Sequence, residues 1–443
     1  MRYTLVSPIL YRSLARNPRL GVTVCGRGLR KLSTIRSGRP FEEEKCPDYR
    51  PKNFYPARTG ETLGGKYELV SKLGWGTGST VWLARTTSWL PWQNDRYVAL
   101  KITNNTPAVR KAARKELEMS EQIFAATTSH PGRQFIRGAV DSFEVQGPDG
   151  THLCMAMEPL RQPLWMLGQQ SGLSSWVQPR TIKTVLPSIL QSLDYLHSEA
   201  GIIHTDLKGD HFMVPFEDTR VLEEYAIRQT ANPAPCVERN GRPIYESRNS
   251  FGHLRSDVTY VKLTDFGLAV RGNKTHDHDI QPREYTAPEV MLKAGWTYPA
   301  DIWNLGLVLW ELLGDVNLLS GRIPGHCKFS NKTRFAQMIR LLGPPPADLV
   351  ARADQDTLSK YYDDQGKFKY PELIPDEMFT LENSTPMLDG QERALFLNFA
   401  KRMLTWLPEK RATAKELLDD PWLKSAGHHR PCGFGYLQDT RLS

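Results

Sequence analysis

The amino-acid sequence predicts an α+β fold with two lobes, a small lobe rich in β-strands and a larger, mostly helical lobe. Short runs with the character of strands occupy residues 67–157. Residues 161–424 are dominated instead by longer runs with apolar residues at positions i, i+3, i+4 and i+7. A chain of 443 residues is long enough for two such lobes with a large core.

The first 41 residues differ in composition from the rest. They carry nine Lys and Arg residues and no acidic residue, so subtracting nine from the net charge of +8 leaves −1 for residues 42–443. Because that body is nearly neutral, we expect no direct nucleic-acid partner. An arginine-rich, serine-containing and acid-free start is the composition of a mitochondrial transit peptide. A disordered basic arm and a mis-assigned start are the alternatives.

The flanking segments and the cysteines narrow the class of protein further. Residues 42–66 are interpreted as an extended leader and residues 425–443 as a C-terminal tail. No apolar run approaches the roughly 18 residues of a membrane-spanning helix, so we expect no membrane partner. The six cysteines include no C-x-x-C pair, which favours a reducing compartment without a disulfide framework or a zinc site.

A glycine-rich turn, Gly74-Trp-Gly-Thr-Gly-Ser-Thr-Val81, joins the first two predicted strands, residues 67–70 and 80–84. Glycines let the backbone close over phosphate groups and leave N–H groups free to point at oxygen. A tight hairpin without a ligand is the alternative. Because the turn is followed by a strand and not by a helix, it argues against a Rossmann or P-loop site.

A lysine ends the next predicted strand, residues 97–101. The ammonium group of Lys101 suits the α- and β-phosphates of a nucleotide and needs a carboxylate to hold it. The helix predicted for residues 108–125 offers Glu116 and Glu118, and we favour Glu116 because the apolar residues beside it then share one face. A solvated helix face is the alternative for either glutamate.

The hinge between the lobes is predicted at Glu158-Pro-Leu160, directly after an apolar strand at residues 153–157. Residues 217–257 are polar, and we interpret them as a surface loop with at most one short helix. An amphipathic helix is predicted over residues 182–196, with apolar residues at i, i+3, i+4 and i+7. Further helices are expected over residues 300–313, 335–342, 393–404 and 412–418.

The loop after the helix at 182–196 carries the chemistry. His204, Asp206 and Lys208 have the spacing of a phosphotransferase catalytic loop, in which the aspartate takes the proton of an attacking hydroxyl and the lysine holds the transferring phosphate. Asp265, in a Thr-Asp-Phe-Gly turn, would hold the metal ion that bridges the nucleotide phosphates. His211 stands where a second metal-binding residue, an asparagine, is expected. An ordinary turn or cap residue is the alternative for each aspartate.

Three residues downstream are expected to stabilise this site. They are Glu289 in an Ala-Pro-Glu motif, Asp301 and Arg411, in that order along the chain. We expect Glu289 and Arg411 to form a buried ion pair, whose disruption would cost about 3–5 kcal/mol. Asp301 is expected to brace the catalytic loop.

These motifs resemble those of the eukaryotic protein kinases, and within them the SR-protein kinases of the CMGC group, in particular their fungal members. The resemblance covers roughly residues 46–424. It implies a protein-kinase fold over residues 67–424, with an N-lobe at 67–157, a C-lobe at 161–424 and the family's spacer at 217–257. The segments that carry the closer similarity are residues 53–60, 73–76, 79–83, 204–206, 278–282 and 338–346.

The resemblance implies a monomer that binds ATP with Mg²⁺, or with Mn²⁺, and phosphorylates a serine or threonine of a protein substrate. It assigns catalysis to Asp206 and Lys208, and metal binding to Asp265 with His211. The residues expected to contact the nucleotide, or to hold its lysine, are Leu73, Gly74, Trp75, Gly76, Thr77, Gly78, Ser79, Thr80, Val81, Ala99, Lys101, Glu116, Met157, Glu158 and Leu160.

Two residues and one segment depart from the family pattern. His211 replaces an asparagine, and imidazole is a poor ligand for Mg²⁺, a hard ion that prefers oxygen. Thr286 replaces the arginine that usually precedes Ala-Pro-Glu in this group. The family grips Arg/Ser-rich substrates in an acidic groove near residues 321–334, but here that segment has four basic residues and no acid. We therefore expect it to repel an arginine-rich peptide.

The sequence thus predicts an ATP-dependent serine/threonine kinase. A pseudokinase or nucleotide-binding scaffold is the alternative, because His211 replaces the metal-binding asparagine. Thr205 stands where most kinases have an arginine that binds an activation-loop phosphate, so the resemblance implies constitutive activity. It also implies a cytoplasmic or nuclear protein, whereas the first 41 residues favour a mitochondrial one.

Overall fold

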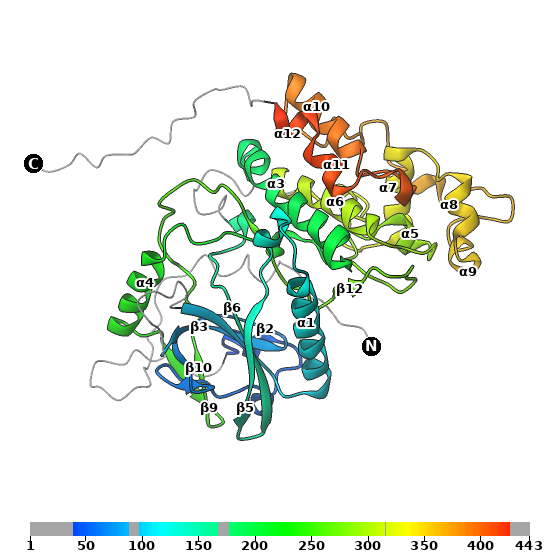
Figure 1. Ribbon diagram of the computed structural model, residues 1–443. Coiled ribbons are helices and arrows are strands. Elements are labelled where there is room, and N and C mark those ends of the chain that lie inside the picture. The colour runs from blue at the N-terminus through cyan, green and yellow to red at the C-terminus, as the bar shows by residue number, and fades with distance from the viewer. Residues whose placement is uncertain (1–38, 88–96, 167–176, 315, 426–443) are drawn as a thin grey trace, which may run out of the picture. The chain divides into compact units, whose positions relative to one another are not determined.

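The structure is a computed structural model that describes residues 39–87, 97–166, 177–314 and 316–425 (Figure 1). The chain forms two compact units. Nearly all of the predicted basic arm and of the C-terminal tail lies outside the described residues. The first unit comprises residues up to 122 with 137–161 and 215–257, and the second comprises 123–136, 162–214 and 258–443.

The first unit is built on a six-stranded antiparallel sheet with the strand order β1-β2-β3-β4-β6-β5. Alternate residues of a strand face opposite sides, so Leu100 and Ile102 pack on one face and Tyr97 and Ala99 on the other. The strands are Thr62–Leu63 (β1), Tyr67–Gly76 (β2), Ser79–Thr86 (β3), Tyr97–Thr103 (β4), Ala139–Gly147 (β5) and Gly150–Met157 (β6).

Different elements cover the two faces of this sheet. Helix α1 (Pro107–Ala125) packs on the face that carries Ala99, where Ala113 clusters with Met155. The hairpin of β9 (Cys236–Arg239) and β10 (Arg242–Tyr245) covers the opposite face. The leader is not simply extended, since it contains the 3₁₀ turns η2 (Glu42–Lys45) and η3 (Pro51–Asn53).

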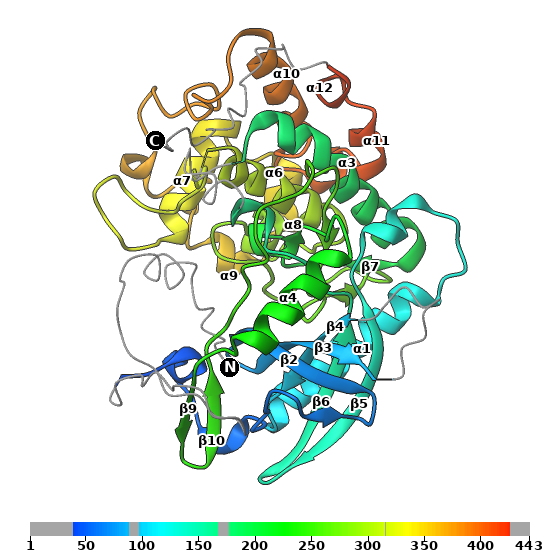
Figure 2. The same cartoon turned by 90° about the vertical axis from the view of Figure 1, so that its left-hand side faces the viewer.

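The segment 217–257 differs from the surface loop that the sequence predicts, because it folds onto the sheet of the first unit. Helix α4 (Arg220–Ala231) has 12 residues and buries one side of its surface. On that side Val221, Leu222 and Tyr225 cluster with Leu73 of β2, and Figure 2 shows α4 lying along β2. The Tyr225 hydroxyl donates to the Arg248 carbonyl at 2.6 Å, which closes the segment on itself.

The second unit is helical, and together the two units confirm the predicted α+β class. Helix α6 is buried on nearly every side, as expected for a helix whose sequence is apolar all round. Within the described part of the chain, no helix has the length and apolarity to cross a membrane. The helices are α3 (Pro179–Tyr195), α5 (Pro288–Met291), α6 (Pro299–Gly314), α7 (Asn331–Leu342), α8 (Ala347–Arg352), α9 (Gln355–Leu358), α10 (Gly390–Lys401), α11 (Ala414–Leu418) and α12 (Pro421–Lys424), with shorter turns η4 (Pro131–Phe135), η5 (Leu196–Ala200), η6 (Gly209–His211), η7 (Pro371–Leu373) and η8 (Pro408–Lys410).

Two short strand pairs position the loops of the second unit. Strand β7 (Ile202–Ile203) pairs with β12 (Val270–Arg271), and β8 (Phe212–Met213) pairs with β11 (Lys262–Leu263). The predicted catalytic loop runs from β7 to β8, and the turn that contains Asp265 runs from β11 to β12. The two pairs therefore bring these loops together.

Candidate active site

The glycine-rich turn of the first unit is a hairpin in which residues 74–76 of β2 pair with residues 79–81 of β3. A Cβ added at Gly74 or Gly76 would meet no described atom within 4 Å, so the turn is open at these positions. Gly78 is different, because a Cβ there would lie 3.1 Å from Val109 of α1. The turn thus offers open backbone on one part and packs closely on the helix at another.

Lys101 of β4 donates to both carboxylate oxygens of Glu116, at 2.8 and 2.7 Å. The two side chains are 22% and 15% exposed, so the pair is largely shielded yet accessible. The pairing favoured from the sequence is present, and the rival Glu118 is exposed on α1. This bidentate contact fixes the ammonium group of Lys101, which lies within β4 and two residues before its end at Thr103.

Three apolar residues expected to contact the nucleotide lie on strands β2, β4 and β6 of the same sheet. Leu73 and Ala99 belong to one buried cluster, and Ala99 pairs across the ladder with Met157. Directly after this strand the Glu158 carbonyl accepts from Arg137 Nε at 2.7 Å, and Leu160 is buried. The backbone of the predicted hinge segment is therefore held by a side chain from the residues just before β5.

Asp301 of α6 braces the catalytic loop of the second unit, as the sequence predicts. Its Oδ2 accepts from the His204 amide and its Oδ1 from the Thr205 amide, both at 2.8 Å. Burial acts to raise the pKa of Asp301, but the hydrogen bond and charge of His197 outweigh it and hold the pKa below its ordinary value. Asn304, one turn further along α6, also bonds the backbone of the loop.

Asp206, Lys208, His211 and Asp265 form one cluster in the second unit. Lys208 Nζ donates to Asp206 Oδ2 at 2.9 Å. His211 lies between the two aspartates, since its Nδ1 donates to the Asp206 carbonyl at 2.9 Å and its Nε2 lies 3.3 Å from Asp265 Oδ2. Asp206 Oδ1 is buried and has no hydrogen-bond partner within the described ranges. The structure thus brings together the four residues to which catalysis and metal binding are assigned.

The backbone of this cluster is strained at two residues. Thr205 has a φ of 68° and Asp265 a φ of 66°, in the left-handed region that residues with a Cβ seldom adopt. Such conformations cost roughly 1–3 kcal/mol each and concentrate at functional sites. The Thr205 hydroxyl donates to the Leu268 carbonyl at 3.0 Å, which ties the catalytic loop to the segment after Asp265.

His204 lies fully buried beneath the cluster, with Nε2 3.1 Å from the Thr264 carbonyl and its ring 5.1 Å from that of Phe266. Burial lowers the pKa of His204, and the charge of His211 acts in the same direction. His204 is therefore a neutral residue that packs the loop and not a proton carrier.

Contacts of an amide and of two aromatic rings help to hold the segment between Asp265 and Glu289. Gln281 donates to the Ala300 carbonyl and accepts from the Ala287 amide, each at 2.8 Å. Trp296 stacks on His276 with ring centroids 4.6 Å apart. Neither Gln281 nor Trp296 had a predicted role, although Gln281 lies within the segment 278–282 that carries the family resemblance. Its φ of 69° is held in place by these contacts.

The predicted ion pair of Glu289 and Arg411 is present. Both guanidinium nitrogens of Arg411 reach the Glu289 carboxylate, at 2.6 and 2.7 Å, and the two side chains are almost completely buried. The pair ties α5 to the segment before α11 within the second unit.

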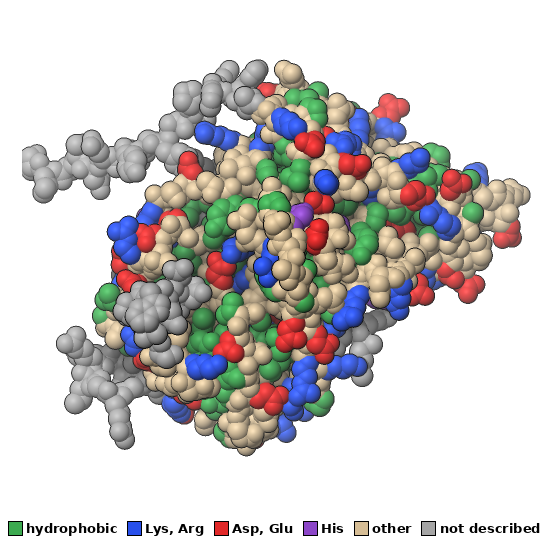
Figure 3. All heavy atoms as spheres, viewed as in Figure 1, with side chains coloured by type: hydrophobic (Ala, Val, Ile, Leu, Met, Phe, Trp, Pro, Cys, Tyr) green, Lys and Arg blue, Asp and Glu red, His purple; other side chains and the backbone are tan. Residues whose placement is uncertain are grey.

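The basic segment 321–334 presents less charge than its composition suggests. Arg334 is fully buried in α7, and burial lowers its pKa to about 9. Arg322 lies 3.5 Å from the Glu284 carboxylate. Two of the four basic side chains therefore do not offer an unpaired surface charge, which weakens the predicted repulsion. Figure 3 likewise shows basic and acidic side chains intermixed over the face drawn there.

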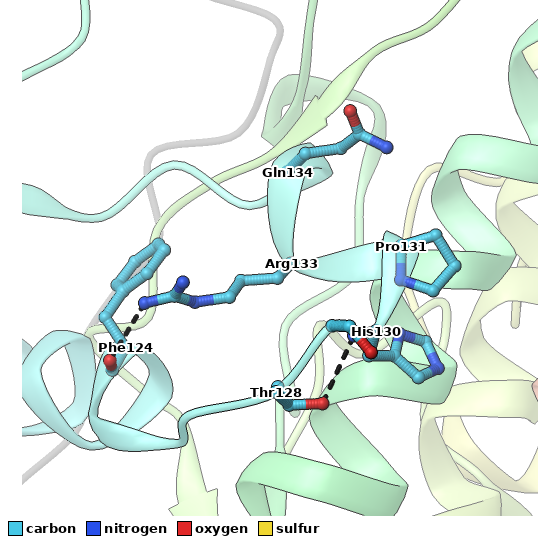
Figure 4. A pocket seen from close by; sticks show the side chains of 7 residues that line it. Phe124, Thr128, His130, Pro131, Arg133 and Gln134 are labelled. Carbon is cyan, nitrogen blue, oxygen red and sulfur yellow. Dashed lines mark hydrogen bonds between the residues drawn. The ribbon is translucent and has the colours of Figure 1, made fainter.

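A surface pocket in the second unit is lined by residues between Phe124 and Gln134, which are not among the predicted site residues (Figure 4). Arg133 reaches across it and donates to the Phe124 carbonyl at 3.0 Å, and the His130 amide donates to Thr128 Oγ1 at 3.2 Å. None of the predicted site residues lines this pocket.

Comparison with known proteins gives consistent matches over most of the chain. The family model described as "Protein kinase domain" matches residues 67–423. A serine/threonine protein kinase of Aspergillus fumigatus is 36% identical over 386 residues, which cover 86% of this chain and 91% of the relative. The serine/threonine-protein kinase SRPK of Physarum polycephalum is 30% identical over 406 residues, with the same coverage of 86% and 91%.

More distant matches agree with these. SRSF protein kinase 3 of Mus musculus is 23% identical over 524 residues, which cover 86% of this chain and 90% of the relative. Among solved structures, the crystal structure of a kinase domain matches with a TM-score of 0.61 and 24% identity, covering 84% of this chain and 99% of that one. The structural match supports the fold.

Proposed function

The chain belongs to the protein kinase family, as a serine/threonine kinase similar to the SR-protein kinases, and we propose that it transfers the γ-phosphate of ATP to serine and threonine hydroxyls of proteins. The environment of Asp206 carries this proposal. Lys208 binds one of its carboxylate oxygens, and the other is buried without a donor in the part of the chain described. A buried acceptor left unpaired costs roughly 1–3 kcal/mol, which the hydroxyl of an acceptor residue would relieve.

In this proposal Asp206 Oδ1 takes the proton of the acceptor hydroxyl while the hydroxyl oxygen attacks the γ-phosphorus. The bond between that phosphorus and the β–γ bridging oxygen breaks, and ADP leaves. Lys208, 2.9 Å from Asp206 Oδ2, neutralises charge on the transferring group. Asp301 and Asn304 hold the loop so that both side chains keep their positions.

The chemistry of Asp265 and His211 fits a divalent metal ion. Their facing atoms, Oδ2 and Nε2, are 3.3 Å apart, a separation that suits two ligands of one ion. An imidazole nitrogen with a carboxylate oxygen suits Mn²⁺ better than Mg²⁺. A bound ion would offset the charge that develops on the phosphate oxygens. We therefore expect Mn²⁺ to support transfer better than Mg²⁺.

The nucleotide-binding groups of the proposal belong to the first unit. The Lys101 ammonium, held by both oxygens of Glu116, would bind the α- and β-phosphates. The open backbone at Gly74 and Gly76 would approach the phosphate oxygens, and the apolar residues around Ala99 would contact the adenine. Transfer requires these groups and Asp206 to act on the same nucleotide.

A pseudokinase is the second candidate, and the same histidine favours it. If Nε2 of His211 carries a proton, it forms an ion pair with Asp265, and the pair then excludes a metal ion from that position. The chain would then bind a nucleotide without transferring its phosphate.

Phosphotransfer by the purified full chain distinguishes these two functions. The chain is incubated with ATP, a mixed serine, threonine and tyrosine peptide library, and either Mg²⁺ or Mn²⁺, and the modified residues are read by mass spectrometry. The kinase proposal expects phosphoserine and phosphothreonine that depend on Asp206 and vanish in Asp206→Asn. ATP binding by wild type without transfer under either metal would establish the pseudokinase instead.

The same experiment also tests which class of peptide the chain phosphorylates. The relatives are named SRPK and SRSF protein kinases, and we propose that arginine-rich acceptors are tolerated but not strongly preferred. The support is that Arg334 is buried and Arg322 lies beside Glu284, while Lys328 and Lys332 remain. Equal rates on arginine-rich and neutral peptides are expected, and a large preference for arginine-rich peptides would contradict the expectation.

We propose two alternative locations in the cell, each supported by a different feature of the chain. The family resemblance supports the cytoplasm or nucleus, and the nine basic residues before residue 42, without any acid, support mitochondria. A fusion of residues 1–41 to a fluorescent protein decides between them, since a diffuse signal would remove the mitochondrial version.

A further inference from the structure

The leader contacts the strand that runs into the glycine-rich turn. Lys72 of β2, two residues before Gly74, is 1% exposed, and its ammonium group donates to Glu43 of the leader and, at 3.1 Å, to the Tyr245 carbonyl. Glu43 is equally buried, and its second oxygen accepts from Arg242 at 2.6 Å. The leader, β2 and the β9–β10 hairpin are therefore joined at one buried cluster of charges.

These charges depend on one another. Burial acts to raise the pKa of Glu43, but the charges of Lys72 and Arg242 outweigh it, so its pKa is lowered and the carboxylate is ionised at neutral pH. An ammonium group as buried as that of Lys72 is costly without a close carboxylate, and the next carboxylate oxygen after Glu43 is Glu42 Oε2, 3.4 Å away. Loss of the Glu43 carboxylate would therefore disturb β2 at that point.

A second contact lies on the other side of Gly74. The Cys46 thiol is 3.8 Å from the Gly76 carbonyl, in the turn itself. Between these two contacts the pairing of β2 with β3 is irregular, with a shift in register between Lys72 and Gly74. The leader thus holds β2 on both sides of the place where its own ladder with β3 is interrupted.

We propose that Glu43 and Lys72 are positioning residues that couple docking of the leader to nucleotide binding by the glycine-rich turn. The inference rests on the proposed function of that turn. With the leader docked, the backbone of residues 74–76 is held in the conformation that receives phosphate. With the leader undocked, the irregular part of β2 is freer, and ordering it opposes binding.

Coupling of this kind is reciprocal. If the docked leader strengthens nucleotide binding by some factor, a bound nucleotide must favour docking by the same factor. Docking can therefore be measured without any transfer of phosphate.

Cys46 reports on docking. It is buried, and burial together with the charge of Glu43 raises the pKa of its thiol to about 11, so it reacts slowly while the leader is docked. Two other cysteines serve as internal references. Cys154 lies in the core of the sheet and reports unfolding of the unit, and Cys327 is exposed and reports the activity of the reagent.

The experiment measures N-ethylmaleimide labelling of each cysteine by peptide mass spectrometry, on the full chain with and without Mn²⁺ and ATP. In wild type we expect the nucleotide to slow labelling of Cys46 about fivefold, and to leave Cys154 and Cys327 unchanged. Glu43→Gln is expected to speed Cys46 labelling and to weaken binding of a fluorescent ATP analogue, each by about tenfold.

Asp141→Asn is the matched control, because Asp141 accepts from Lys66 and Tyr67 at the far end of β2, both at 2.9 Å. It should change neither Cys46 labelling nor ATP binding. If Glu43→Gln speeds the labelling of Cys46 and Cys154 equally, Glu43 only stabilises the fold of the unit, and the proposal is overturned.

The wild-type experiment keeps the proposal open to refutation even if Glu43→Gln does not fold. Unchanged Cys46 labelling while the ATP analogue demonstrably binds would overturn the coupling and leave the kinase proposal intact. Absence of ATP binding by wild type would instead overturn the proposed function, and the coupling with it.

Discussion

His211 Nε2 lies 3.3 Å from Asp265 Oδ2, while His211 Nδ1 lies 2.9 Å from the carbonyl oxygen of Asp206. A carbonyl oxygen only accepts hydrogen bonds, so Nδ1 carries a proton and Nε2 faces the carboxylate. The imidazole therefore joins the residue assigned to proton transfer to the residue assigned to metal binding. We propose that this arrangement sets the metal preference of the site.

Replacing His211 with asparagine should change that preference. The amide supplies an oxygen ligand, which Mg²⁺ prefers to nitrogen. We expect the ratio of the Mn²⁺ affinity to the Mg²⁺ affinity to fall by about tenfold in His211→Asn. Competition between the two ions, followed by electron paramagnetic resonance of Mn²⁺ with ADP present, measures it directly. An unchanged ratio would mean that His211 does not bind the ion.

The Lys101–Glu116 pair predicts a clear difference between neighbouring glutamates. Glu116→Gln removes the carboxylate that holds the Lys101 ammonium group through both oxygens, so we expect nucleotide binding to weaken by about tenfold. Glu118→Gln, two residues along the same helix at an exposed position, is the control and should bind within about twofold of wild type. Titration of a fluorescent ATP analogue gives both values, and equal losses would exclude the assigned role of Glu116.

The buried pair of Glu289 and Arg411 predicts a large loss of stability. Arg411→Met leaves the Glu289 carboxylate buried without its partner, at a cost of about 3–5 kcal/mol in the free energy of unfolding. Arg352→Met removes an arginine whose partner, Glu409, is 51% exposed, and should cost no more than about 1 kcal/mol. Urea unfolding followed by tryptophan fluorescence compares the two variants. Similar midpoints would refute the assigned importance of burial.

His152 predicts how stability responds to mild acid. It is buried, and burial lowers its pKa below the ordinary value of about 6.5. Below about pH 6.5 the imidazole of His152 binds a proton in the unfolded chain but not in the folded chain, so the free energy of unfolding decreases as the pH falls. Above about pH 7 the imidazole is neutral in both states, and His152 adds no pH dependence. The slope contributed by one such group is at most about 1.4 kcal/mol per pH unit.

His152→Gln should remove this part of the pH dependence. Between pH 7.5 and 5.5 we expect wild type to lose more of its free energy of unfolding than the variant does, by about 1 kcal/mol. His253→Gln, at an exposed position of the same unit, is the control and should follow wild type. If the free energy of unfolding depends on pH in the same way for all three proteins, His152 titrates alike in the folded and unfolded chains, and the prediction is wrong.

Local patterns in the sequence were sufficient for much of the fold and for the Lys101–Glu116 ion pair. The strand that ends at Lys101 and the helix that carries Glu116 follow from periodicity, and their spacing implies the contact. The long helices of the second unit are equally periodic. Strand β5 was not predicted, because most of its residues are only partly buried and its apolar pattern is weak.

Contacts between distant segments were beyond the reach of such patterns. Glu43 meets Lys72 from 29 residues away and Arg242 from 199, and no local feature links them. The length of helix α4 and its packing on the sheet were not predicted, because its apolar residues stand among charged ones and form a continuous face only against β2. Arg334 was counted as a surface charge because basic residues are seldom buried.

Phosphotransfer at Asp206 is tested by measuring γ-phosphate transfer by the full chain in the presence of Mn²⁺, with Asp206→Asn and His211→Asn measured beside wild type. We expect transfer by wild type, none above background by Asp206→Asn, and continued transfer by His211→Asn with a stronger response to Mg²⁺. Transfer by His211→Asn with none by wild type would contradict this expectation, because the histidine would then block the reaction that the rest of the site is built to perform.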